Sequence, residues 1–354
     1  MVMVERYGIP PTRIISAVQG FKVPFRSVQP DDRIVIFTDD AMDPMVWQAA
    51  MAALRDKGCD PTLCMFSRRT HHCGDPTEAA IASVGGADVI LALTTTALNS
   101  GTPALKKIRA EGGGGNVGRT PIWLMEELTV EILTEGGGKA NLKDVEEICE
   151  TQRRIGEIYD RSKILHVTSD SGTDLTADIS DMPEPNYSAT RWGKVPFGRN
   201  AKTGKLAGGT WPFGEIHIEP KPGTANGTVV WDTTAHFPPG RWDKPVKLTI
   251  KNGRVTDISG GTEADQVKWY LEKYGDDKSL DVGGEIALGT NKYCQPRTGM
   301  MRSEKKRLGA MHFGIGTGAD RGKIFSTLRL EGITDRVTFV ADNTAICKDG
   351  KIVV

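Results

Sequence analysis

The first 162 residues alternate short apolar runs with amphipathic segments, and this pattern constrains the fold more than any other feature. Four apolar runs have the length of strands, at 33–39, 61–66, 87–93 and 120–125, and the first of them ends in polar residues. Helical patterns lie between them, at 45–57, 77–84 and 102–111. Parallel strands are buried on both faces and need crossover connections, which are usually helical. The alternation therefore predicts an α/β domain with a doubly wound, mostly parallel sheet.

Local signals support this organisation. Asp43 and Pro44 stand where a helix N-cap and a first helical residue are expected. A long amphipathic helix over 142–162 closes the domain, which we place at 1–162. The glycine runs 112–115 and 136–138 do not form a G-x-G-x-x-G turn after a strand, so the sequence predicts no dinucleotide site.

From residue 163 the pattern changes to short strands joined by turns. The expected strands are 164–168, 228–231, 246–250, 254–258, 324–330 and 336–340. Asn252-Gly253 is a strong hairpin signal, and 263–274 is the one clear helix. These features predict an α+β domain at 163–354 with mainly antiparallel sheet, and we expect it to carry the active site.

Composition excludes several classes of function. Lys and Arg together number 45, as do Asp and Glu, so the net charge gives no footprint for nucleic acid or an anionic membrane. No apolar run approaches the roughly 20 residues that span a bilayer, and the N-terminus lacks the apolar core of a secretory signal. Six cysteines form no C-x-x-C pair. We expect a cytoplasmic enzyme with a small-molecule substrate.

The segment 211–232 is the most informative for function. Glu215, His217 and Glu219 alternate along an extended run, so their side chains project from one face and can begin a metal site. Glu285 precedes an apolar strand, and an unpaired buried carboxylate is costly, so it needs a cation, a metal ion or a proton. Glu331 poses the same problem.

Several of these residues have alternative interpretations. His312 lies in an apolar segment between glycines and is either a buried hydrogen-bonded residue or a metal ligand. Arg329 is an obvious partner for Glu331. Of the remaining histidines, His166 favours a structural or substrate-contact role, and His236 lies in a turn with no role assigned. We interpret His71-His72-Cys73 as a polar loop in preference to a metal clip.

A family resemblance joins these segments. Six segments carry it: H-V-T-S-D-S-G-T-D-L (166–175), W-P-F-G-E with G-T-A-N-G-T-V-V-W-D (211–232), the N-G-R-V hairpin, G-E-I-A-L-G-T-N (284–291), L-G-A-M-H-F-G-I-G (308–316) and S-T-L-R-L-E-G-I (326–333). Over most of its length the chain resembles the aminopeptidase T family of metallopeptidases and the related 2,5-dihydroxypyridine dioxygenases. Since those families form dimers, the resemblance implies a homodimer.

The resemblance also implies a ligand set, from which this chain departs. The peptidases hold two metal ions with two glutamates, two histidines and an aspartate. Glu215 and Glu285 match the glutamates and His312 the first histidine, but the closing histidine-x-aspartate pair falls on Arg329 and Glu331. The dioxygenases bind iron(II) with a histidine at position 285 and that same pair, so none of those three ligands is present here.

These departures favour one divalent ion, with Mn, Mg, Zn or Fe as candidates. We expect Glu285, His312 and Glu331 or Glu215 to hold it, with His217 in reserve. The remaining carboxylate, Glu215 in the simplest case, would act as general base. Arginine cannot ligate a metal ion.

Three functions follow from this ligand set. The first is a metal-dependent hydrolase that cleaves an amide in a small or cyclic molecule, or acts as an aminopeptidase, with Arg329 contacting an anionic group of the substrate. The second is a ring-cleaving iron dioxygenase. The third is a metal-free descendant that uses acid–base chemistry or only binds.

Two further features are expected near the site. Tyr293 and Arg297 follow the Glu285 strand in a loop that should overhang it, where either could steady an oxyanion or contact substrate. The alternative is that both are solvent-exposed loop residues. The stretch 183–209 is rich in Gly, Pro, Lys and Arg, and the sequence leaves open whether it is a lid or a dimer contact.

Overall fold

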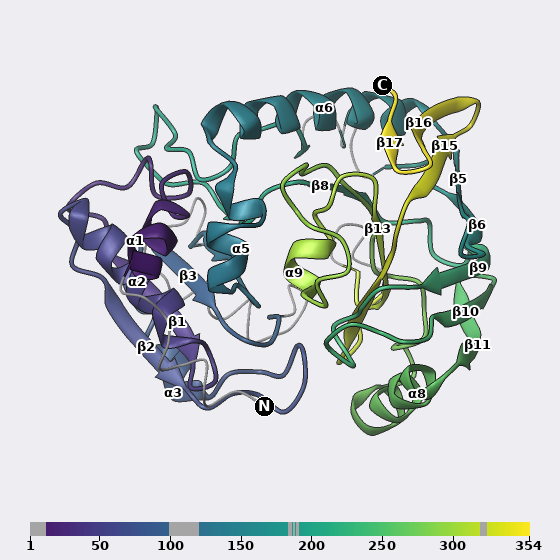
Figure 1. Ribbon diagram of the computed structural model, residues 1–354, viewed down its shortest axis with the longest axis horizontal. Helices are drawn as coiled ribbons and strands as arrows, with labels where there is room; N and C mark the ends of the chain where they lie inside the picture. The colour runs from purple at the N-terminus through teal and green to yellow at the C-terminus, as the bar shows by residue number, and fades with distance from the viewer. Residues whose placement is uncertain (1–11, 99–119, 183–185, 187, 189–190, 319–323) are drawn as a thin grey trace.

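The computed structural model describes residues 12–98, 120–182, 186, 188, 191–318 and 324–354. The expected helix at 102–111 and the glycine run at 112–115 lie outside the described residues. In Figure 1 the N-terminal half lies on the left and the antiparallel half on the right, with helix α6 (Leu142–Arg161) crossing above both.

The N-terminal half contains a five-stranded sheet of order β2-β1-β3-β4-β7, and each pair of neighbours is parallel. Its strands are β1 (Ile34–Asp39), β2 (Thr62–Phe66), β3 (Val89–Leu93), β4 (Ile122–Leu124) and β7 (Gly209–Thr210). Its helical elements are α1 (Thr12–Gln19), α2 (Pro44–Asp56), α3 (Glu78–Ala82), α5 (Val130–Thr134) and the 3₁₀ turn η2 (Gly137–Lys139). The predicted α/β class is confirmed. Asp43 caps α2 by accepting the N–H of Met45, with Pro44 in the first turn.

The C-terminal half pairs an eight-stranded sheet of order β11-β10-β9-β6-β5-β15-β16-β17 with a four-stranded sheet of order β14-β13-β12-β8. The strands of the larger sheet are β5 (Ile164–Ser169), β6 (Asp174–Asp178), β9 (Asn226–Trp231), β10 (Val246–Lys251), β11 (Arg254–Gly260), β15 (Val337–Ala341), β16 (Thr344–Lys348) and β17 (Lys351–Ile352). Those of the smaller are β8 (Glu215–Ile218), β12 (Ile286–Gly289), β13 (Met311–Gly316) and β14 (Arg329–Thr334). Helices α8 (Thr262–Tyr274) and α9 (Met301–Glu304) complete it. The predicted antiparallel α+β half is confirmed.

Two local predictions have different outcomes. Asn252 and Gly253 join β10 to β11 with φ of 49° and 72°, as a two-residue hairpin requires. The strand expected at 324–330 is wrong in its bounds, because β14 begins only at Arg329. Before it, the Oγ of Ser326 and the N–H of Thr327 donate to the carboxylate of Asp276, which holds this segment in a loop.

The two halves are joined by more than one connection. After β6 the chain returns to the parallel sheet, where β7 pairs with β4, and Phe197 and Trp211 pack in the core of the N-terminal half. The described part of 183–209 therefore contributes to that core. Helix α6 packs in both cores, with Val145 in the first and Ile155 in the second. The division at residue 162 stays a proposal.

The eight-stranded and four-stranded sheets share one buried core. Gly332 of β14 lies against the ring of Trp231 from β9, and a Cβ at that glycine would come within 2.2 Å of the indole. The close approach fixes β14 on the larger sheet. Within the described residues, no helix is long and apolar enough to cross a membrane.

Candidate active site between the two halves

The four-stranded sheet brings the predicted ligands together. Its register places β13 between β12 and β14, so His312 and Glu331 lie on adjacent strands, Glu285 immediately precedes β12, and Glu215 begins β8. The His312 Nε2 lies 2.9 Å from Glu285 Oε1 and 3.5 Å from Glu215 Oε2. We call Glu215, Glu285, His312 and Glu331 the carboxylate centre. All but Glu215 are buried, and His312 is fully so.

Three fixed cations neutralise the three carboxylates of this centre. Arg329 bridges two of them, with its Nη2 2.6 Å from Glu285 Oε1 and its Nε 2.6 Å from Glu331 Oε1. Lys305 Nζ lies 3.3 Å from Glu331 Oε2, and Lys306 contacts Glu215. A guanidinium between two carboxylates occupies the electrostatic role that a metal ion has in a carboxylate cage.

The charges set the direction of each pKa. Burial raises the pKa of Glu285 and of Glu331, but the neighbouring cations outweigh it and hold both well below the usual range. Burial likewise works to raise the pKa of Glu215, but Lys306 and His312 lower it to about 2. So acidic a carboxyl is a weak base, and the general-base role expected of Glu215 stays a prediction.

Two histidines, His312 within the centre and His217 beside it, make different contacts through their ring nitrogens. The Nδ1 of His312 lies 3.3 Å from the carbonyl oxygen of Lys305. A proton on Nδ1 would donate there and leave Nε2 as the ligand atom, which is the usual second contact of a metal-bound histidine. His217 Nδ1 lies 2.8 Å from Glu285 Oε2, so the reserve residue also reaches the centre.

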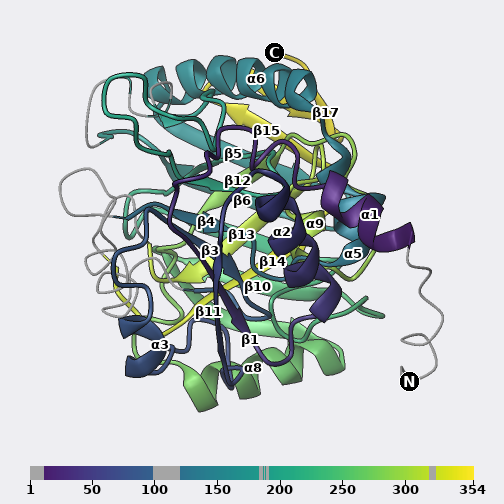
Figure 2. The ribbon, with the colours of Figure 1, turned by 90° about the vertical axis from the view of Figure 1, so that its left-hand side faces the viewer.

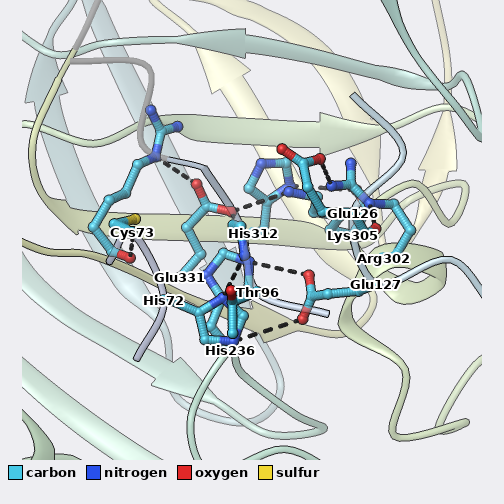
Figure 3. A network of polar contacts seen from close by, with 12 residues as sticks. His72, Cys73, Thr96, Glu126, Glu127, His236, Arg302, Lys305, His312 and Glu331 are labelled. Carbon is cyan, nitrogen blue, oxygen red and sulfur yellow. Dashed lines mark hydrogen bonds and ion pairs between the residues drawn. The ribbon is translucent and has the colours of Figure 1, made fainter. Parts of the chain in front are cut away.

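A second group, formed by His72, Glu127 and His236, lies beside the carboxylate centre (Figure 3). Glu127 Oε1 lies 3.9 Å from His72 Nε2, and Glu127 Oε2 lies 3.6 Å from His236 Nε2. His236 Nε2 is also 3.7 Å from Glu331 Oε2, which connects the two groups. We call these three residues the interdomain triad, because His72 and Glu127 follow β2 and β4 whereas His236 follows β9.

Sequence reasoning missed this triad. It dismissed His72 as part of a polar loop, gave His236 no role and did not consider Glu127. The signal that could have found them is topological: residues that follow parallel strands meet at the carboxyl edge of the sheet, where α/β proteins bind ligands.

The surroundings of the triad, in which both histidines are buried and Glu127 is partly buried, oppose charge. Burial lowers the pKa of His72 to about 3 and the pKa of His236 well below its usual value. Burial also raises the pKa of Glu127 to about 7, although Arg302 and Lys305 act to lower it. The two imidazoles stack with centroids 4.6 Å apart, an arrangement that suits neutral rings.

Replacing Glu127 with glutamine should stabilise the protein at pH 8 but not at pH 5. The pKa of this carboxyl is raised on folding, so its favourable contribution is present below pH 4.5 and is lost as the pH rises through about 7. Glutamine has no charge to bury, and we expect a gain on the order of 2 kcal/mol at pH 8 relative to pH 5. Urea unfolding at both pH values measures it. Glu131→Gln, at a half-exposed position, is the control, and equal effects of Glu127→Gln at both pH values would contradict the expectation.

Three residues predicted for the site lie elsewhere. The Tyr293 hydroxyl donates to the Asp144 carboxylate on α6 at 3.0 Å, so its loop is held against that helix. Arg297 is exposed. His166 pairs with Asp174 at the surface of the larger sheet, 2.8 Å away. Within the described residues, none of the three hydrogen-bonds or pairs with the carboxylate centre.

Comparison with known proteins connects this site to a family. The family model for 2,5-dihydroxypyridine 5,6-dioxygenase matches residues 19–313. The chain belongs to this family. The search of curated proteins gives no match for this dioxygenase-family chain.

Two solved structures share the fold of this dioxygenase-family chain. The 2,5-dihydroxypyridine dioxygenase of Pseudomonas putida KT2440 aligns with a TM-score of 0.73 and 19% identity, over 98% of this chain and 99% of that one. AmpT from Thermus thermophilus aligns with a TM-score of 0.60 and 13% identity, over 98% and 100%. The predicted superfamily is confirmed, and membership of the dioxygenase family indicates an enzyme.

The described residues of this dioxygenase-family chain contain two candidate metal-binding groups, Glu285–His312–Glu331 and the interdomain triad. The donor set of the first fits one divalent ion, because His312 can offer Nε2 and the carboxylates supply hard oxygen ligands. Arg329 pairs with one carboxylate oxygen of Glu285 and one of Glu331, so an ion held by these carboxylates would compete with the guanidinium.

Proposed function

We propose that the protein is a metal-dependent hydrolase that cleaves an amide bond in a small or cyclic molecule at the carboxylate centre. The carrying observation is the donor set: three carboxylates and one buried histidine converge, with an arginine where a further ligand would stand. Iron oxygenases use two histidines and one carboxylate, whereas hard oxygen ligands suit Mn or Zn acting as a Lewis acid.

The roles of this chain's own residues follow from their contacts. Glu285, His312 and Glu331 would hold the ion, with Glu215 beside them. When bound, such an ion lowers the pKa of a coordinated water and polarises a carbonyl. Arg329 would contact an anionic or ring oxygen of the substrate through N–H groups not engaged by the two carboxylates, since a guanidinium carries five donors. Lys306 and Lys305 keep the carboxylates ionised.

A ring-cleaving dioxygenase is the second candidate, and the family match over residues 19–313 favours it. The two proposals differ in their use of oxygen. A ring-cleaving dioxygenase consumes molecular oxygen and is inactivated when its iron is oxidised, whereas hydrolysis proceeds under nitrogen.

The test begins with metal content. Protein purified without added metal or chelator is measured by plasma emission beside Glu285→Ala, and is assayed on a panel of cyclic amides and on 2,5-dihydroxypyridine. About one equivalent of Mn or Zn, lost in the variant, with hydrolysis under nitrogen, supports the hydrolase. Iron with oxygen uptake on 2,5-dihydroxypyridine supports the dioxygenase. Absence of metal from both samples would overturn both proposals.

Replacing Arg329 with histidine should raise the affinity for a divalent ion at least about tenfold. The change removes the cation that competes for the oxygens of Glu285 and Glu331, and adds an imidazole ligand. Competition with a chromophoric zinc chelator measures the affinity. Arg336→His is the matched control, because Arg336 is half-exposed and pairs with two surface aspartates, Asp170 and Asp349. Unchanged affinity in Arg329→His would mean that no ion binds between these carboxylates.

The oligomeric state and the cellular location of the protein are further proposals. We propose a homodimer on the family resemblance, and a cytoplasmic location on the six free cysteines of the chain. Size-exclusion chromatography with light scattering tests the first.

A further inference from the structure

We propose that strand β2 is the contact surface for a second copy of this chain, and that the two β2 strands pair antiparallel across a twofold axis. This pairing joins the two parallel sheets into one continuous sheet. The inference is independent of the metal ion and of the chemistry proposed above. It assigns a surface to the proposed homodimer.

Strand β2 is an outer strand of the parallel sheet. Only β1 pairs with it among the described strands, and Figure 1 shows it on the side of that sheet away from the C-terminal half. Within the described residues, no group outside the sheet hydrogen-bonds to the backbone of residues 62–65. Met65 is 46% exposed. This edge is therefore open to another strand.

The backbone groups that point outward follow from the pairing with β1. The N–H of Asp40 donates to the carbonyl of Phe66 at 3.0 Å, so the peptide groups of Phe66 face β1. Backbone orientation alternates along a strand. Leu63 and Met65 therefore direct their N–H and carbonyl groups away from β1. Two opposing residues of an antiparallel pair exchange both hydrogen bonds, so Leu63 of one copy can pair with Met65 of the other.

The sequence around β2 is complementary to itself in this register. Residues 60–68 read D-P-T-L-C-M-F-S-R, with an acid at one end, a base at the other and no charge between. When Cys64 of one copy lies opposite Cys64 of the other, Leu63 faces Met65 on both sides of the axis. Cross-strand apolar pairs of this kind stabilise a sheet.

The charged ends select the same register. With Cys64 on the twofold axis, Asp60 of each copy lies opposite Arg68 of the other. Asp60 and Arg68 are both exposed, and neither forms an ion pair within the described residues. Opposite charges that face each other across strands are favourable, and like charges are unfavourable. A shift of the register by two residues in either direction would lose both matches.

The other edge strands of the described sheets oppose such pairing. A charged side chain, a very short strand or a covering segment protects an exposed edge. β11 contains Arg254, β17 contains Lys351, β8 begins with Glu215, β14 begins with Arg329, and β7 is only two residues long. β2 has five residues and no charge, so among these edges it is the one suited to a second copy.

The first experiment measures the association of the full-length protein by sedimentation velocity at micromolar concentrations. We expect a dimer whose dissociation constant rises at least about tenfold in Met65→Lys, because a lysine on an edge strand disfavours pairing. Val353→Lys is the matched control, since Val353 is an apolar residue of similar exposure, 50%, outside β2. Its dissociation constant should equal that of the wild type.

A charge exchange tests the register. Asp60→Arg and Arg68→Asp each place like charges opposite one another, so each variant alone should dimerise more weakly than the wild type. When the two variants are mixed, both ion pairs form between them, and we expect a heterodimer about tenfold tighter than either homodimer. A mixture of Asp257→Arg with Arg68→Asp is the control, because Asp257 is exposed on β11, and it should form no tighter heterodimer.

Cys64 provides a covalent probe of the axis. Of the six free cysteines it is the one that is not buried. Residues that face each other without exchanging hydrogen bonds have Cα atoms about 4.5 Å apart, within the range that a disulfide spans. The two-electron oxidant diamide should therefore link two copies through Cys64, as a dimer on a non-reducing gel that dithiothreitol reverses. Cys64→Ser should give no linked dimer.

Three outcomes would overturn the inference. They are a wild-type protein that stays monomeric, a dimer that Met65→Lys leaves intact, and a mixture of Asp60→Arg with Arg68→Asp that forms no tighter heterodimer. The second would leave the proposed homodimer standing with its interface elsewhere. The proposed hydrolase stands or fails separately, because none of these measurements involves a metal ion or a substrate.

Discussion

Replacing Glu285 with alanine is expected to destabilise the protein by about 3 kcal/mol, besides removing its metal ligand. Glu285 is the common partner of three groups: Arg329 at 2.6 Å, His217 at 2.8 Å and His312 at 2.9 Å. Its removal takes away one of the carboxylates that balance the buried guanidinium and leaves Glu331, with a weaker contribution from Glu219. Urea unfolding at pH 7 measures the change.

The double variant Glu285→Ala/Arg329→Ala identifies the cause. If the cost comes from the uncompensated charge, removing Arg329 as well should restore part of the stability, and a double-mutant cycle measures the coupling. Glu150→Ala, which breaks an exposed helix pair, should change stability by less than about 1 kcal/mol. A Glu285→Ala protein as stable as the wild type would show that the carboxylate centre is solvated and not buried.

Replacing Arg302 with methionine is expected to cost about 3–5 kcal/mol, because it breaks a buried ion pair between the two halves. Arg302 of α9 contacts the Glu126 carboxylate, and its Nε donates to the Glu126 carbonyl at 2.6 Å. Each side chain is 3% exposed, so the unpaired carboxylate would stay away from water. Urea unfolding followed by tryptophan fluorescence measures the loss.

Two companion variants make this expectation specific. The double change Arg302→Met/Glu126→Leu should recover most of the stability, since a buried pair replaced by apolar groups is often neutral. Arg13→Met breaks a partly exposed pair with Glu131 and should cost no more than about 1 kcal/mol. Equal costs for Arg302→Met and Arg13→Met would contradict a buried interdomain pair.

The sequence predicted well the features that depend on local periodicity. The run at 33–39 became β1, the pattern at 45–57 became α2 with its Asp43 cap, and Asn252-Gly253 formed the hairpin. Period and turn chemistry determine such elements within a few residues of chain. The bounds of β14 depended instead on Asp276, about fifty residues away in sequence, which no local pattern contains.

The candidate site was predicted in part for the same reason. The family motifs fixed the order of β12, β13 and β14, so Glu285, His312 and Glu331 were expected to meet, and they do. Lys305, Lys306 and the interdomain triad were missed, because a lysine beside a short helix or a histidine in a turn has no period to indicate burial. Their importance arises from contacts between strands and loops that are distant in sequence.

Helix α6 restricts how the two halves of the molecule can move relative to each other. In Figure 2 it lies along the upper edge of the molecule, and its Gln152 Nε2 donates to the carbonyl of Glu215 at 2.9 Å and to Thr290 Oγ1 at 3.2 Å. One helix thus packs in the first core through Val145, near its start, and holds the backbone of the carboxylate centre through Gln152, near its middle. A hinge motion between the two halves would have to break α6 or separate it from one of the two hydrophobic cores. We therefore expect the site to keep a fixed shape. Substrate specificity would then come from steric and polar complementarity, and the turnover rate would not be limited by closure of the two halves.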